Sequence, residues 1–261
     1  MAVSSCIPEQ QQKLSYSCPQ SKRPPGIEIN FLHRDDQLVV LNKPADVSLL
    51  RDRSGAACLW DALPDCLGQK PYLVHRLDKP TSGALAIALD QATQRQLTKA
   101  FNARTVRKFY LAWVLGDPGP GGEIDLPLKK GRKSRYRVAG QRADIERRAD
   151  NNRADNGDVA GRWLLSNADP DGHPSLTRFR RLTRTEDRSL LLLQPRTGRT
   201  HQLRVHLSWI GHPILGDRLY GNPNDTAQHA NRLYLHARSL HLPGWDCFRA
   251  PLEPGWRLPG R

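Results

Sequence analysis

Residues 75–89 read HRLDKPTSGALAIAL, a polar segment that runs directly into six consecutive apolar side chains. Pro80 and Gly83 lie in the polar part, and both residue types are frequent in turns. The apolar part has the length of one buried strand rather than of a helix. The stretch therefore predicts a turn followed at once by a buried strand over 83–89.

Apolar periodicity and turn residues mark further elements on both sides of this stretch. The clearest strand is 108–115, which is closed by the turn sequence GDPG at 116–119. Apolar spacing predicts helices at 58–67, 90–102, with Asp90 as N-cap, and 200–210. We predict additional strands at 37–42, 177–185, 189–194 and 232–242.

The order of these elements indicates the fold class. The strands occur in pairs with few helices between them, whereas a doubly wound sheet alternates strands and helices. The sequence therefore predicts an α+β fold, with an antiparallel or mixed sheet and helices at its periphery.

The composition points to a polyanionic partner. The chain has 40 Lys and Arg against 26 Asp and Glu, a net charge of +14, and a mean hydropathy of −0.62. No apolar run is longer than seven residues, which is too short to cross a bilayer. The first residues are rich in Gln, Ser and Pro and lack the apolar segment of a secretory signal peptide. We expect no membrane partner.

The five cysteines are scattered and contain no C-x-x-C pair. This usage is typical of reduced thiols in a reducing compartment, so we expect a cytoplasmic protein. Neither these cysteines nor His201 and His206, which are five residues apart, have the spacing of metal ligands on one helix face. We expect no metal.

The pattern divides the chain into a flexible leader over 1–26, a single domain over 27–252 and a C-terminal coil over 253–261. Within the domain, the apolar pattern disappears over 129–172, which we interpret as a loop-like insertion. Its first part, 129–148, has nine basic residues and two acids, a net charge of +7. A solvated linker is one interpretation of this stretch. We favour an arm that lies along phosphates, because like charges repel unless an anion neutralises them.

Asp78 is the candidate nucleophile. It lies between Arg76 and Lys79 in a segment of turn formers, and nearby cations favour an ionised carboxylate. A single Asp more often caps a turn, but here nine neighbouring residues form one pattern. Tyr110, on the clearest strand, can stack on a base and move a proton, although core packing explains most strand tyrosines.

Residues 197–217 read TGRTHQLRVHLSWIGHPILGD and contain the third candidate group. Free backbone donors beside Gly198, Arg199 and Thr200, at the start of a helix, attract anions. Arg204 lies away from the apolar stripe of that helix and can reach a carboxylate in a bidentate pair. Solvent is an equally good partner for Arg204 on the sequence alone.

The segments His75–Gly83 and Gly198–His206 resemble the two long motifs of the RluA family of RNA pseudouridine synthases. The resemblance extends from Asn42-Lys43-Pro44, through Lys108-x-Tyr110, to Leu235-His236-Ala237, and covers about 28–252. It implies the pseudouridine synthase fold, a long, mixed, mostly antiparallel sheet with flanking helices and a central cleft. It also implies that no cofactor is used.

The resemblance assigns roles to four residues. Asp78 matches the catalytic aspartate, Tyr110 the tyrosine that stacks on the uracil and helps to remove the proton at carbon 5, and Arg204 the arginine that pairs with the aspartate. Arg76 matches the residue that fills the gap left by the flipped nucleotide. We expect further RNA contacts from His75, Arg199, His201, Lys129, Lys130, Arg132, Lys133 and Arg135.

Many relatives carry an additional N-terminal RNA-binding domain, for which the 26-residue leader is too short. We therefore expect that the catalytic domain and its loops recognise the substrate, which is tRNA, 23S rRNA or both. We also expect a monomer. Two other functions remain open: a catalytically silent RNA-binding protein on the same scaffold, and a hydrolase that uses His75 and Asp78. Replacement of Asp78 by Asn separates the first from an enzyme.

Overall fold

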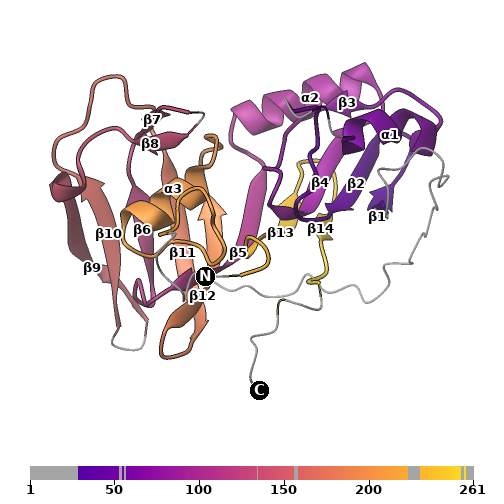
Figure 1. Ribbon diagram of the computed structural model, residues 1–261. Helices are drawn as coiled ribbons and strands as arrows, with labels where there is room; N and C mark the ends of the chain where they lie inside the picture. Colours follow the sequence, from indigo (N-terminus) through magenta and orange to yellow (C-terminus); the bar gives the residue numbers. More distant parts are fainter. Residues whose placement is uncertain are drawn as a thin grey trace. The chain divides into compact units, whose positions relative to one another are not determined.

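The computed structural model describes residues 29–52, 55, 57–133, 135–155, 158–222, 230–253 and 256 (Figure 1). The predicted leader, and all but two residues of the predicted C-terminal coil, lie outside this part of the chain. The chain folds into two compact units. Unit 1 comprises the residues up to Arg107 and those from Ala237 onward, and unit 2 comprises Lys108–His236.

Unit 1 is built on a sheet whose strands follow the order β1, β2, β4, β13, with β3 beside β4 and β14 beside β13. The pairs β1–β2, β2–β4, β3–β4 and β13–β14 are antiparallel. The first two residues of β13 belong to unit 2. The strands are β1 (Asn30–Arg34), β2 (Leu38–Lys43), β3 (Tyr72–Leu73), β4 (Ser82–Ala88), β13 (Leu235–His241) and β14 (Cys247–Arg249).

Strand β4 is the predicted buried strand, and all seven of its residues are buried. Gly83, its second residue, has φ of +113°, and a Cβ there would lie 2.3 Å from the carbonyl oxygen of Ala237. Only glycine fits such a close approach of two backbones at this φ. The glycine at the end of the polar segment therefore allows β4 to start directly beside β13.

Helices α1 (Leu59–Leu67) and α2 (Gln91–Asn102) complete unit 1. As predicted, Asp90 is the N-cap of α2: its carboxylate accepts hydrogen bonds from the backbone N–H (2.8 Å) and hydroxyl (2.6 Å) of Thr93. Leu97 of α2 packs in one apolar cluster with Ala84 and Ala86 of β4. The helix thus covers the strand that follows the Asp78 segment.

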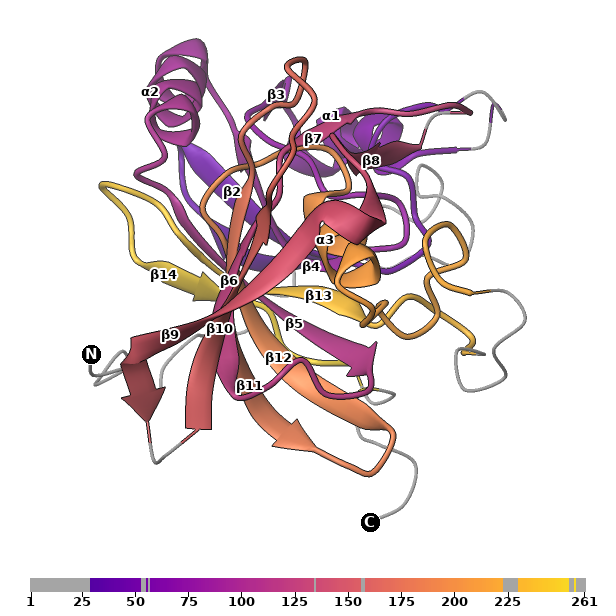
Figure 2. The same cartoon turned by 90° about the vertical axis from the view of Figure 1, so that its left-hand side faces the viewer.

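Unit 2 has a sheet in the order β5, β12, β11, β6, β10, β9, and β7 and β8 form a separate hairpin (Figure 2). The pair β6–β10 is parallel, and β5–β12, β11–β12, β6–β11 and β9–β10 are antiparallel. The mixed, mostly antiparallel sheets confirm the predicted α+β class. The strands are β5 (Arg107–Leu115), β6 (Gly121–Asp125), β7 (Leu128–Lys130), β8 (Tyr136–Val138), β9 (Ile145–Asp155), β10 (Asp158–Leu165), β11 (Leu176–Arg184) and β12 (Arg188–Pro195).

Helix α3 (Gln202–Trp209) packs against β12 and β8, and its residues from Gln202 to Ser208 are all buried. The predicted apolar stripe is therefore only part of the contact surface of α3. Leu203, Val205 and Leu207 lie in the same apolar cluster as Leu191 and Leu193 of β12. A helix buried on all sides places its polar side chains in the interior, where each needs a partner.

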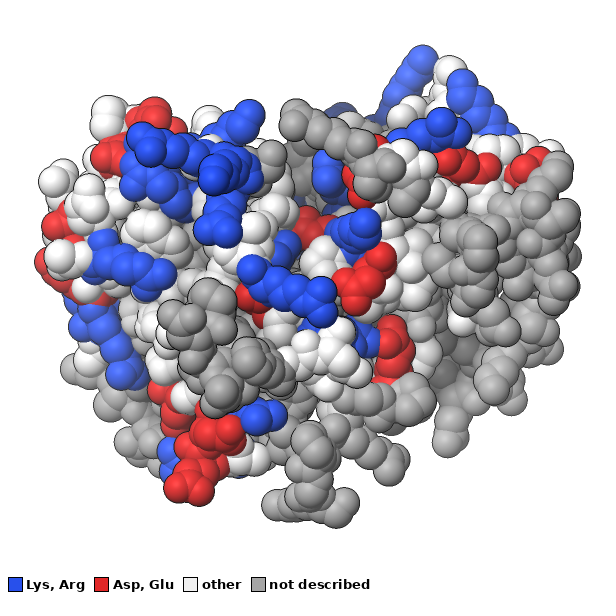
Figure 3. Space-filling model, in the orientation of Figure 1, with Lys and Arg blue, Asp and Glu red and all other residues white. Residues whose placement is uncertain are grey.

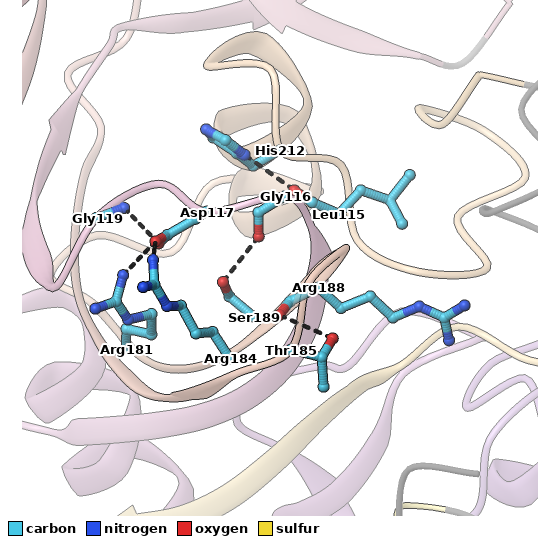
Figure 4. Close-up of polar contacts among 10 residues, drawn as sticks. All are labelled: Leu115, Gly116, Asp117, Gly119, Arg181, Arg184, Thr185, Arg188, Ser189 and His212. Carbon is cyan, nitrogen blue, oxygen red and sulfur yellow. Dashed lines mark hydrogen bonds and ion pairs between the residues drawn. The ribbon is translucent and has the colours of Figure 1, made fainter. Parts of the chain in front are cut away.

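Basic residues also stabilise the turn that ends β5 (Figure 4). The Asp117 carboxylate accepts hydrogen bonds from Gly119 N–H (2.9 Å), from Nη1 of Arg184 (2.9 Å) and from Nη1 of Arg181. Burial alone would raise the pKa of the Asp117 carboxyl, but the hydrogen bonds from Arg181, Gly119 and Arg184 outweigh it and hold that pKa below its ordinary value. Part of the positive charge of the chain is therefore neutralised internally.

The interpretation of 129–172 as loop-like was wrong, because most of it forms β7, β8, β9 and β10. Backbone hydrogen bonds to β10 hold β9 at the sheet edge, so β9 does not need a buried face. Glu146, Arg147 and Arg148 of β9 are exposed, and the Arg147 guanidinium lies 5.0 Å from the centre of the Trp163 ring. A charged edge strand of this kind lacks the alternation of apolar and polar residues from which a strand is predicted.

The other predicted elements of the sheet are confirmed with small shifts at their ends, except that β13 is shorter than the predicted strand 232–242. The short strands β1, β3, β6 and β14 were not predicted. The expectation of reduced thiols was wrong for Cys66, which is disulfide-bonded, whereas Cys58 and Cys247 are free.

Candidate active site and RNA-binding surface

Asp78 lies in unit 1 on the connection between β3 and β4, and its side chain is half-buried. Its carbonyl accepts a hydrogen bond from Thr81 N–H at 3.0 Å, which closes a tight turn. Leu77, the residue before it, is buried, while Arg76 is exposed. The segment thus presents Asp78 on a turn, as predicted, and the buried side chain of Leu77 anchors that turn.

Two buried or half-buried side chains hold this turn from either end. Before it, His75 Nε2 accepts the N–H of Ala86 in β4 at 2.9 Å, and its ring stacks on Phe101 of α2 at 4.7 Å. After it, Nζ of the fully buried Lys43 donates to the carbonyl of Lys79 at 3.0 Å. The position of Asp78 is therefore fixed through contacts on both sides.

The Lys79 side chain pairs with a carboxylate other than that of Asp78. Its Nζ forms an ion pair with Asp52 Oδ2 at 3.2 Å, and Ser48 Oγ donates to the same oxygen at 3.1 Å. The expectation that Lys79 acts as a flanking cation for Asp78 is thus weakened by a competing carboxylate. Arg76, the other flanking cation, is exposed on the surface of unit 1.

Tyr110 lies on β5 in unit 2, opposite Leu193 of β12, and packs against the main apolar cluster of that unit. Lys108 is two residues earlier on the same strand, so both side chains point to one face of the sheet. Burial lowers the pKa of the Lys108 ammonium. A Cβ on Gly198 would lie 3.4 Å from Lys108 Nζ, which places the segment before α3 beside this face.

That segment is organised by Gln202, the first residue of α3. Its Oε1 accepts hydrogen bonds from the Thr197 hydroxyl (2.6 Å) and the N–H of Arg199 (3.1 Å), and its amide donates to the carbonyl of Leu176 (3.0 Å). The N–H of Arg199 is therefore already bonded and does not serve the anion site expected at this helix start. The Arg199 side chain is exposed, and its Nε donates to the carbonyl of Pro174 at 3.4 Å.

Arg204 is buried in α3, with 5% of its surface exposed. Its Nε and Nη2 donate to Oδ2 and Oδ1 of Asp217, both at 2.8 Å, and Asp217 is 2% exposed. Of the two partners that the sequence left open for Arg204, a carboxylate and solvent, the structure therefore shows the carboxylate, which belongs to Asp217. Such a fork fixes both the position and the plane of the guanidinium.

Asp217 and Tyr220 are residues of this site that the sequence did not assign. Asp217 Oδ1 also accepts the backbone N–H of Leu219 (3.0 Å) and of Tyr220 (3.1 Å). The Tyr220 ring lies 5.2 Å from the Arg204 guanidinium carbon, and its hydroxyl contacts His201 Nδ1 at 2.7 Å. Gly216-Asp217 follows α3 closely in the sequence, but nothing local shows which side chain an isolated Asp contacts.

His206, also on α3, is fully buried and has a structural role. Its Nε2 is 2.9 Å from the carbonyl of Leu126 and its Nδ1 is 3.0 Å from the Thr177 hydroxyl. Burial lowers its pKa to about 4, so the ring is neutral at ordinary pH. Among the described residues, no group of three or more His, Cys, Asp or Glu side chains could hold a metal ion.

The basic stretch 129–148 divides into paired and exposed cations. Lys129 binds Asp169 (2.7 Å) and Asp171 (3.0 Å), and the hydrogen bonds that it donates to these carboxylates raise its pKa. Arg142 donates to the carbonyls of Ser208 and Trp209 at the end of α3. Arg137 pairs with Asp169 and Arg148 with Glu146. These cations already have anionic or carbonyl partners within the protein.

Four further cations of this stretch, all of them exposed, lie on the β7–β8 hairpin. In Figure 3, Lys and Arg side chains gather over the part of unit 2 where Figure 1 places β7 and β8. The hairpin is tied to the rest of unit 2, because the N–H of Tyr136 donates to the Tyr220 hydroxyl at 2.9 Å. We call these residues the hairpin cations: Lys130, Arg132, Lys133 and Arg135.

Comparison with known proteins adds independent information. The protein family described as RNA pseudouridylate synthase matches residues 37–209. An uncharacterized RNA pseudouridine synthase of Chloroflexus aurantiacus is 38% identical over 188 residues, which cover 70% of this chain and 50% of that protein. The chain thus spans about half the length of this relative. No helix in the described part of the chain is long and apolar enough to cross a membrane.

Three further similarities cover most of both partners. The tRNA pseudouridine synthase C of Haemophilus ducreyi is 34% identical over 224 residues, 83% of this chain and 86% of that protein. The solved structure of human RNA pseudouridylate synthase domain containing 4 is 28% identical, with a TM-score of 0.68 over 87% of this chain and 89% of that one. The ribosomal large subunit pseudouridine synthase C of Vibrio parahaemolyticus is 30% identical over 87% of this chain and 67% of that protein.

Proposed function

The chain belongs to the RNA pseudouridylate synthase family, and we propose that it isomerises uridine to pseudouridine in structured RNA with Asp78 as its nucleophile. The observation that carries this proposal is the anchored turn of Asp78. Lys43 and His75 hold the turn at its two ends, and the side chain itself remains half-buried rather than enclosed. A nucleophile held in this way keeps one orientation without being sealed from a substrate.

The reaction needs a nucleophile, a proton acceptor and a cation, and we propose one residue for each role. The bond from C1′ of the ribose to N1 of uracil breaks, and a new bond forms from C1′ to C5. The proton at C5 leaves and N1 gains one, so atoms balance without any oxidant or reductant. Asp78 attacks the uridine, Tyr110 stacks on the uracil and helps to remove the C5 proton, and Arg204 pairs with Asp78.

The target base must leave its stack before Asp78 can reach it. Extrusion from paired RNA costs a few kcal/mol, so a side chain that fills the vacated space makes the flipped state more favourable. Arg76 is exposed and lies two residues from Asp78, which suits it to this role. A guanidinium plane can stack on neighbouring bases while it contacts phosphates.

We further propose that the hairpin cations contact the RNA backbone. They are exposed, whereas Lys129 and several cations that follow in the sequence have protein partners. Phosphate contacts supply affinity without base specificity. Arg199 and His201 lie next to α3 and are proposed as secondary contacts; Lys129 contributes only if RNA competes with its two carboxylates.

We propose tRNA, 23S rRNA or both as substrate, and a cytoplasmic monomer as the working form. Relatives named for tRNA and for the large ribosomal subunit match the chain over similar lengths, which supports both substrates equally. A hydrolase that uses His75 as an acid or base is less well supported, because His75 Nε2 accepts a backbone N–H.

Carbodiimide mapping of pseudouridine in total RNA tests the proposal in cells. We expect at least one site in tRNA or rRNA to disappear when the gene is deleted. The wild-type gene restores that site, and a gene carrying Asp78→Asn does not. An identical pseudouridine map with and without the gene would instead support a catalytically silent RNA-binding protein.

A further inference from the structure

We propose that the outer face of α2, together with the turn that ends this helix, is a further RNA-binding surface, which contacts the backbone of a paired stem. Its cations, which we call the α2 cations, are Arg95, Lys99 and Arg104. All three belong to unit 1 and are exposed. The inference rests on the proposal that the substrate is structured RNA, but it does not depend on the role of Asp78.

The helix and the turn after it carry charge of one sign. Residues 91–107 include four basic residues and no acid, a net charge of +4 in 17 positions. Like charges four residues apart, as Arg95 and Lys99 are, destabilise a helix, whereas opposite charges at this spacing stabilise it. Within the part of the chain that the structure describes, no ion pair or hydrogen bond joins the side chain of an α2 cation to another residue. An anion from outside the protein would therefore complete this surface.

The backbone of Arg104 provides independent evidence, because it is left-handed, with φ of +59°. Its N–H donates to the carbonyl of Phe101 at 3.1 Å, and the N–H of Thr105 donates to the carbonyl of Ala100 at 3.1 Å. These two bonds form a Schellman motif, whose left-handed residue is usually glycine because a Cβ is strained there. An arginine at this place lowers stability, and residues held in such conformations concentrate at functional sites.

The helix dipole offers a purely structural explanation for cations at this end of α2. A positive charge after the last turn is favourable, but the effect decreases sharply beyond that turn. Lys99 already supplies a cation in the last turn. Arg95 lies in the second turn, too far from the end for this explanation, and the strain at Arg104 opposes any gain from the dipole. RNA binding accounts for all three cations together.

The other exposed side chains of α2 indicate which part of an RNA this surface fits. Most of them are amides or hydroxyls, which can bind phosphate oxygens and 2′-hydroxyls, and none is aromatic: Gln91, Ala92, Gln96, Thr98 and Asn102. Unpaired bases are commonly bound by stacking on aromatic rings, whereas paired RNA is contacted through its phosphates and 2′-hydroxyls. The surface therefore fits the backbone of a stem rather than a loop with exposed bases.

The opposite side of α2 contacts the segment that precedes Asp78. The His75 ring stacks on the Phe101 ring with their centres 4.7 Å apart, and Nε2 of Gln94 donates to the carbonyl of Leu73 at 3.1 Å. The helix thus connects its outer face to the segment that leads into the turn of the candidate nucleophile. RNA bound on that face is held by the same unit that positions Asp78.

The experiment compares two variants that have lost the same charge. The test variant carries Arg95→Gln, Lys99→Gln and Arg104→Gly, and its affinity for bulk tRNA at physiological salt should fall by about 10-fold or more. The slope of log affinity against log salt should decrease by about 0.7–0.9 for each phosphate that is no longer neutralised. The control replaces by Gln three cations of unit 2 that pair with carboxylates, and should bind within about threefold of wild type: Arg162, Arg184 and Arg188. Equal losses in both variants, or no loss in the test variant, would overturn the proposal.

Arg104→Gly alone separates a binding role from a structural one. Glycine relieves the strain of the left-handed backbone, so we expect Tm to rise by about 2 °C while the affinity for bulk tRNA falls by about twofold or more. Higher stability with weaker binding is not expected of a residue that only supports the helix. A lower Tm with unchanged affinity would show such a supporting role and would remove Arg104 from the surface.

Poly(U), which is unpaired, tests the assignment to a stem. The test variant should lose less affinity for poly(U) than for bulk tRNA, and an equal loss on both would overturn the assignment to paired RNA. If wild type binds neither RNA, this inference and the proposed substrate class fail together. If wild type binds bulk tRNA and the test variant binds it equally well, the inference alone fails.

Discussion

Nζ of Lys43 lies 3.0 Å from the carbonyl oxygen of Lys79, the residue that follows Asp78. The same ammonium donates to the carbonyls of Pro44 (2.7 Å) and Val47 (2.8 Å), and the side chain is fully buried. Three carbonyl acceptors match the three N–H donors of an ammonium. A lysine at the end of β2 therefore connects the core of unit 1 to the turn of the candidate nucleophile.

Replacement of Lys43 by Met should damage both stability and activity. The three carbonyls would lose a charged donor inside the protein, and each unsatisfied buried group costs about 1–3 kcal/mol. We expect the free energy of unfolding in urea to fall by about 3 kcal/mol or more. The residual folded protein should show a reduced single-turnover rate because the turn of Asp78 is loosened. Lys70→Met, which changes an exposed side chain of unit 1, is the control and should alter neither quantity.

The hairpin cations predict a specific salt dependence of RNA binding. Replacement of all four by Gln should weaken binding and lower the slope of log affinity against log salt by about 0.7–0.9 for each phosphate that the variant no longer neutralises. A control variant replaces four other cations of the same stretch, all with partners within unit 2: Lys129, Arg137, Arg147 and Arg148. Equally weakened binding by the two variants would show that net charge alone matters, and that the hairpin has no special role.

From the lowered pKa of His206 we predict how the stability of the protein depends on pH. Its pKa in the folded protein is about 4, below the ordinary value of 6.5, because the ring is buried. The unfolded chain therefore binds one more proton than the folded chain between these values, and stability falls as pH decreases from 6.5 to 4. The contribution of this residue is about 1.4 kcal/mol per pH unit in that window and is constant below it.

The contribution of His206 is isolated by comparing the unfolding free energies of wild type and of His206→Gln at several pH values. His206→Gln should be less stable than wild type near pH 7, but its stability should decline less steeply between pH 6.5 and 4. The control His173→Gln changes an exposed histidine and should keep the slope of wild type. Parallel curves for wild type and His206→Gln would contradict the assignment.

Local patterns in the sequence were sufficient to predict the strand that follows Asp78 and the strand that contains Tyr110. The buried strand β4, the N-cap Asp90 of α2 and the strand β5 follow from side chains close together in the chain. The motif residues themselves lie on or beside these elements, so the sequence was enough to identify the family.

Long-range contacts and edge strands could not be predicted in the same way. The partner of Arg204 in the fork, Asp217, is 13 residues away beyond the end of α3, and no local pattern identifies it. Strand β9 is mostly polar because it lies at a sheet edge, so its sequence is typical of a loop. Charge counting also could not separate the hairpin cations from those, such as Lys129, that bind nearby carboxylates.

The single-turnover rate of Asp78→Asn measures the central claim most directly. Tritium release from C5-labelled uridine is followed in the same RNA for wild type, Asp78→Asn and the control Asp36→Asn, which changes an exposed carboxylate of unit 1. We predict no detectable release with Asp78→Asn, RNA affinity within about threefold of wild type, and a normal rate with Asp36→Asn. Release by Asp78→Asn at the wild-type rate would contradict the account.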